Sequence, residues 1–63
     1  MKLITTPNIS DPDSFYLELI ESQRDLDTEA AERMNARLIL LLANHIGDRE
    51  ALTEALAAAR PRQ

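Results

Sequence analysis

The sequence predicts a small all-α protein: a three-helix hairpin or bundle with an extended N-terminal arm, completed by self-association. The chain has 63 residues, is rich in alanine, leucine, glutamate and arginine, and contains a single glycine, a composition typical of helices. Apolar residues recur at helical spacing in three segments. An aspartate precedes each segment, where its side chain can accept hydrogen bonds from the free N–H groups of a first helical turn.

The whole chain, residues 1–63, is expected to form one helical domain. Residues 1–9 are predicted to be an extended arm, because the proline within them disfavours helix at the residue before it. The first helix is expected over about residues 12–24, starting at Asp11 and Pro12, since proline suits the first helical position. Its apolar stripe consists of Phe15, Tyr16, Leu19 and Ile20.

The second helix is expected over residues 28–46. Asp27 or Thr28 can cap its start. Gly47 is the natural end, because glycine readily adopts the left-handed conformation that terminates many helices. The segment between these signals contains no proline or glycine, so nothing in it should interrupt the helix.

The third helix is expected over residues 49–59. Asp48 directly follows the end of the second helix and can cap the third. Pro61 prevents the helix from continuing far. Short connections between successive helices favour antiparallel neighbours, as in helical hairpins and bundles.

The second helix carries an apolar belt that runs most of the way round it. In steps of about 100° per residue, Leu38 and Leu41 fall close to Met34, whereas Leu40 falls on the opposite side. A surface helix normally has an apolar stripe only somewhat wider than about 100°. A chain this small has little protein with which to cover such a belt, and without cysteine it has no disulfides to compensate. We therefore expect a homodimer.

The belt divides into two sectors. The sector of Met34, Leu38 and Leu41 suits contacts within the chain, which we expect from Phe15, Leu19, Leu52 and Leu56. The opposite sector has small residues on either side of one leucine, which lets two helices approach to about 8–10 Å. In a two-fold dimer such a patch meets itself. The predicted self-association interface consists of Ala36, Leu40, Ala43 and Gly47.

A candidate polar site consists of Asn35, His45 and Asp48. His45 lies within the apolar face, and Asp48 is placed to accept its ring N–H. The pair could act as a general base or a pH switch, but we favour a structural histidine that interacts with the negative end of the helix dipole. A buried asparagine needs a hydrogen-bond partner and can fix the register of helix pairing, which is the role that we favour for Asn35.

No catalytic, cofactor-binding or metal site is predicted, and we expect that the protein is not an enzyme. Asp11 and Asp13 suggest a calcium loop, but the glycine and glutamate that such a loop requires are absent from their positions. The net charge of −4 and the pI of 4.7 argue against nucleic-acid binding, which favours a basic surface. No apolar run approaches the ~20 residues of a membrane span. We expect a soluble, cytoplasmic protein without a membrane partner.

The block "NARLILLLANHIGD", preceded by "DPDSFYLELIES" and followed by "EALAAAR", resembles a family of short bacterial proteins of unknown function. The similarity covers about residues 7–60. The resemblance carries no established activity or cofactor. It implies an accessory role at most, through an association of the family with flavin-dependent aromatic hydroxylases.

Two functional hypotheses remain open. The first is a non-catalytic interaction protein that self-associates through its second helix and offers its acidic first helix to a larger protein partner. The second is a small-ligand carrier, or an accessory subunit of a flavin-dependent, aromatic-degrading enzyme. A deep cavity would favour the second hypothesis, and its expected lining is Leu38, Leu42, Phe15 and His45.

Overall fold

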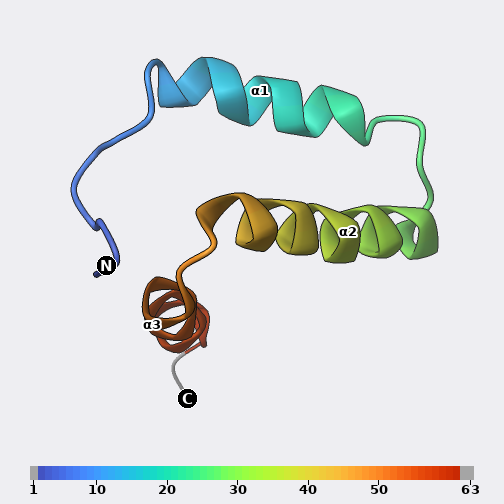
Figure 1. Cartoon of the computed structure of the whole chain (residues 1–63). Helices are drawn as coiled ribbons and strands as arrows, with labels where there is room; N and C mark the ends of the chain where they lie inside the picture. Colours follow the sequence, from blue (N-terminus) through green and yellow to red (C-terminus); the bar gives the residue numbers. More distant parts are fainter. Residues whose placement is uncertain (1, 62–63) are drawn as a thin grey trace.

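The computed structural model describes residues 2–61 and confirms the predicted all-α class. These residues form three helices and no strand: α1 (Pro12–Ser22), α2 (Thr28–Ile46) and α3 (Arg49–Ala59) (Figure 1). α1 ends two residues before the predicted end, and the bounds of α2 and α3 agree with the prediction. Residue 1 of the predicted arm and residues 62–63 of the predicted domain lie outside the described residues.

Each helix begins at an aspartate whose side chain accepts a backbone N–H three residues further along the chain. This bond satisfies one of the free donors of the first helical turn. Asp11 has a φ of 52°, a left-handed conformation that aspartate tolerates better than most residues, and Pro12 follows it as the first helical residue. The three capping bonds are Ser14 N–H to Asp11 Oδ1 (3.3 Å), Ala30 N–H to Asp27 Oδ1 (2.8 Å) and Ala51 N–H to Asp48 Oδ1 (2.9 Å).

A sharp elbow joins α2 to α3. Gly47 ends α2 with a φ of 67°, and its N–H donates to the carbonyl oxygen of Ala43 at 2.9 Å. A residue with a Cβ would be strained at this φ. Because Asp48 caps α3 at once, only two residues separate the helices, and the direction of α3 relative to α2 is fixed locally.

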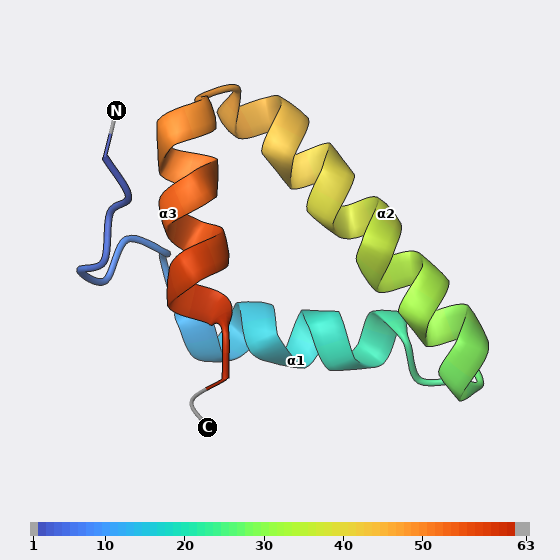
Figure 2. The ribbon, with the colours of Figure 1, turned by 90° about the horizontal axis from the view of Figure 1, so that it is seen from below.

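The helices form an open arrangement rather than a closed bundle. Figure 2 shows them as the three sides of a triangle, and Figure 1, turned by 90°, shows that α1 and α3 stand well apart. No two helices pack along their lengths. The radius of gyration is 13.4 Å, whereas a compact chain of this length would have about 10.6 Å.

The interior of the described chain is correspondingly small. Ala51, 4% exposed, is its single buried residue. Of the side chains expected to pack within the chain, Met34, Leu38, Leu19 and Leu52 are half-buried. The same expectation was wrong for Phe15, Leu41 and Leu56, which are 46%, 69% and 70% exposed, because no two helices of the described chain pack along their lengths.

Among residues 2–61, two side-chain hydrogen bonds join separate elements of the chain. Gln23, at the end of α1, donates from Nε2 to Oδ1 of Asn35 on α2 at 2.7 Å. Glu54 of α3 accepts the backbone N–H of Leu3 at its Oε2 at 2.8 Å. The first bond ties α1 to α2, and the second ties the N-terminal arm to α3.

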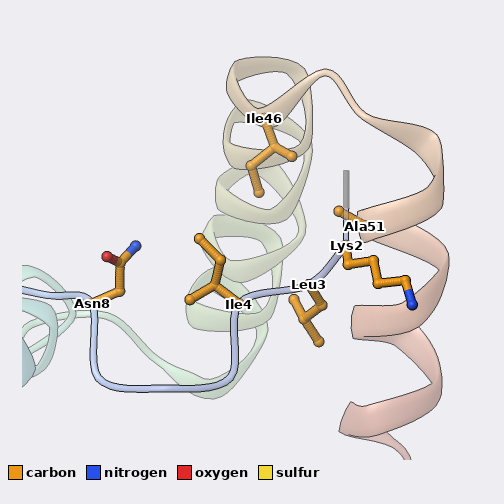
Figure 3. Close-up of a pocket in the computed structure, with 6 residues that line it drawn as sticks. All are labelled: Lys2, Leu3, Ile4, Asn8, Ile46 and Ala51. Carbon is orange, nitrogen blue, oxygen red and sulfur yellow. The ribbon is translucent and has the colours of Figure 1, made fainter.

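The arm lies against the elbow without forming helix or strand. Figure 3 shows Ile4 pointing toward Ile46, with Leu3 and Lys2 beside Ala51. These side chains, with Asn8, line a notch of about 260 Å³. The arm therefore lies against Ala51, the one buried residue of the described chain.

We predict that Asp27→Ala lowers the free energy of unfolding by about 0.5–2 kcal/mol, the usual cost of losing an N-cap. Asp25→Ala is the matched control, since it removes the same charge two residues earlier but no capping bond. Urea unfolding of both variants at one protein concentration measures the difference. Equal losses in the two variants would contradict the capping role.

Candidate interaction surface

The middle of α2 exposes large apolar side chains in several directions. Ile39, Leu40, Leu41 and Leu42 are 62%, 70%, 69% and 51% exposed. Successive residues of a helix point about 100° apart, so these four side chains point in four directions around the axis. At this level the chain covers α2 only partly, on the side of the half-buried Leu38.

The residues of the predicted self-association interface occupy three different settings. Ala36 and Leu40 are exposed on α2. Ala43 is half-buried where α2 faces α3. Gly47 belongs to the elbow and ends α2. The patch therefore runs along α2 from its open middle to the elbow.

An apolar groove lies between α2 and α3. Its volume is about 400 Å³, and Arg49 supplies the one charged side chain of its lining. Sequence reasoning missed this groove, because it assigned Leu52 and Leu56 to the intrachain core. The repeat of apolar residues at 52, 55, 56 and 59 was the available signal, but its direction depends on the angle of the elbow. The lining consists of Ile39, Ala43, Arg49, Leu52, Thr53, Ala55, Leu56 and Ala59.

The three residues of the candidate polar site are not brought together. Asn35 binds Gln23 near the end of α1, whereas His45 and Asp48 lie at the elbow. The ring of His45, in the last turn of α2, makes no hydrogen bond or ion pair with residues 2–61. The predicted bond from His45 to Asp48 is therefore not formed. Asp48 instead directs its carboxylate to the start of α3, where it accepts the N–H of Ala51.

This capping bond is the main cause of a shift in the pKa of Asp48. The Ala51 N–H stabilises the ionised carboxylate and holds the pKa of Asp48 below its ordinary value of 3.8. A carboxylate with a lowered pKa stabilises the fold above its ordinary pKa. That contribution is lost as the pH falls through the lowered value.

The described residues offer no built small-molecule or metal centre. No three histidine, aspartate or glutamate side chains among them lie close enough together to share a metal ion. The deep cavity that would favour the ligand-carrier hypothesis is not formed among these residues, since Phe15 and Leu42 are 46% and 51% exposed. Within residues 2–61 there is also no helix of the length and apolar character needed to cross a bilayer. The apolar surface of α2, with the groove beside it, is the candidate site.

We predict that Asp48→Asn lowers the free energy of unfolding at pH 7, and that the difference from the wild type disappears near pH 2. Asparagine keeps a capping oxygen but not the charge, so the comparison isolates the ionised form of Asp48. Urea unfolding at both pH values measures the two differences. A difference that stayed the same at pH 2 would show that the charge of Asp48 does not contribute.

Comparison with known proteins places the chain in a family. Residues 3–61 match the family described as "Protein of unknown function (DUF2783)". No curated protein and no solved structure matches the chain. The match spans nearly the whole sequence and includes all three helices, and the chain belongs to the DUF2783 family.

Proposed function

We propose that this protein is a non-catalytic interaction protein that forms a homodimer through α2. The contact consists of Ala36, Leu40, Ala43 and Gly47. The observation that carries the proposal is the exposed middle of α2, where the four successive apolar side chains Ile39 to Leu42 are each more than half exposed. Leaving even two of these side chains in water forgoes about 1.5–3 kcal/mol each. A domain is stable by only about 5–15 kcal/mol in total.

The surface area of the chain supports the same conclusion. It exposes 6088 Å², whereas a compact monomer of its mass would expose about 4,100 Å². The difference, about 2,000 Å² per chain, exceeds the ~800 Å² that each partner buries in a standard interface. It corresponds to the larger interfaces of obligate homodimers.

The composition supports the setting that we propose, the cytoplasm of a bacterium. The sequence has no cysteine and so needs no oxidising compartment. The acidic residues of α1, Asp13, Glu18 and Glu21, are exposed. This acidic surface is available to a larger protein partner once α2 is engaged in the dimer.

A second candidate function is an accessory subunit or carrier for a small aromatic ligand, serving a flavin-dependent, aromatic-degrading enzyme. The groove between α2 and α3 favours it, because its volume of about 400 Å³ lies in the range of ligand pockets. The groove is open, however, and ligand pockets usually enclose most of their ligand. A second protein chain would cover more of such an open surface than a small ligand would.

We predict that the wild-type protein sediments at twice its monomer mass of 7.1 kDa at micromolar concentration. Leu40→Glu should raise the dimer dissociation constant at least about 100-fold, because the contact would then bury charges without partners. Asn44→Glu, which adds the same charge on the polar strip of α2, should change it little. Sedimentation equilibrium measures all three proteins. A wild type that remains monomeric throughout the micromolar range would refute self-association.

A further inference from the structure

We infer that the association surface continues from α2 onto α3, and that the groove between these helices receives the Leu40 side of a second copy's α2. This inference rests on the proposed self-association and specifies where the second chain binds. Ala43 connects the two surfaces, since it belongs both to the proposed contact and to the lining of the groove.

The groove has the character of a helix-binding surface. Its lining is apolar apart from Thr53 and Arg49, so burying it requires little desolvation of charge. Leu56, on its α3 side, and Leu40, on α2, are both 70% exposed, the highest values among the large apolar side chains of the described chain. Amphipathic helices bind other proteins by placing such residues into an apolar groove between helices.

Two-fold symmetry makes this arrangement reciprocal. A patch that meets its own copy contributes both a ridge and a groove to the same interface. Leu40 of each chain then lies against Ile39 and Ala43 of the other α2, and against Leu52 and Leu56 of the other α3. The small residues Ala36 and Ala43 on either side of Leu40 allow the helices to approach closely.

The size of the open chain identifies a second copy as the occupant. Its radius of gyration, 13.4 Å, is close to the ~13.8 Å of a compact body of two such chains. If two open chains closed into one compact body, each would bury about 2,700 Å². A small ligand in the groove would cover only a minor part of that area. A second copy covers both the groove and the middle of α2.

The first test compares the same substitution at two leucines that are both largely exposed. Leu56→Glu changes the groove, and Leu17→Glu changes α1, where Leu17 is 62% exposed. We expect sedimentation equilibrium to show a dissociation constant at least about 100-fold higher for Leu56→Glu and nearly unchanged for Leu17→Glu. Equal effects of the two variants, or a larger effect of Leu17→Glu, would refute the groove as the binding site of the second chain.

The second test does not depend on a disruptive substitution. The sequence contains no cysteine, so Thr53→Cys and Thr5→Cys each introduce a single thiol in place of an exposed threonine of similar size. Well above the dissociation constant, iodoacetamide should react at least about tenfold more slowly with the Thr53→Cys thiol, because a covered thiol is inaccessible. Dilution below the dissociation constant should remove the difference.

The outcomes separate this inference from the proposed function. A monomeric wild type refutes both. A dimeric wild type whose Thr53→Cys thiol stays as reactive as that of Thr5→Cys refutes only the groove and assigns the contact to another face. Protection of the Thr53→Cys thiol by added phenol in a monomer would assign the groove to an aromatic ligand, and would also overturn the inference.

Discussion

The direction of α3 is set by two adjacent residues, and most of the tertiary features follow from it. Gly47 supplies a left-handed residue that ends α2, and Asp48 starts α3 by accepting the N–H of Ala51. The resulting elbow creates two concave surfaces. One is the notch beside Ala51, which the N-terminal arm of the same chain lines together with Ile46 (Figure 3). The other is the groove beside Ala43, which no part of the described chain fills.

In this arrangement some apolar residues make contacts within the chain, and others stay exposed on its surface. The arm, the elbow and the ends of the helices hold the elements in place through a few contacts, such as the bond between Gln23 and Asn35. The large apolar side chains in the middle of α2 take no part in these contacts. Domains of this size bury only about 60% of their unfolded surface and often need further stabilisation. In the proposed dimer, the second chain supplies that stabilisation.

Features determined by neighbouring residues were predictable from the sequence. The aspartate caps, Pro12 as first helical residue and Gly47 at the end of α2 all follow from local backbone chemistry. The positions of Leu41 and Leu56 were not predictable, because they depend on the angles between helices, which the hydrophobic pattern does not encode. The prediction of a hydrogen bond from His45 to Asp48 was wrong for a related reason. The ring N–H of His45 and the backbone N–H of Ala51 are both within reach of the Asp48 carboxylate in the sequence. Their spacing alone did not show that the Ala51 N–H would bind it.

The bond between Leu3 and Glu54 joins segments 51 residues apart, and it is unusual in this chain, because most other contacts lie within single helices or at their ends. Contacts of that local kind form quickly, on the microsecond timescale of helix formation. Closing the arm onto α3 instead requires the ordering of a long loop, whose entropic cost grows with the logarithm of its length. The entropic cost of the long loop therefore falls on the contact between the arm and α3, and forming that contact completes the enclosure of Ala51.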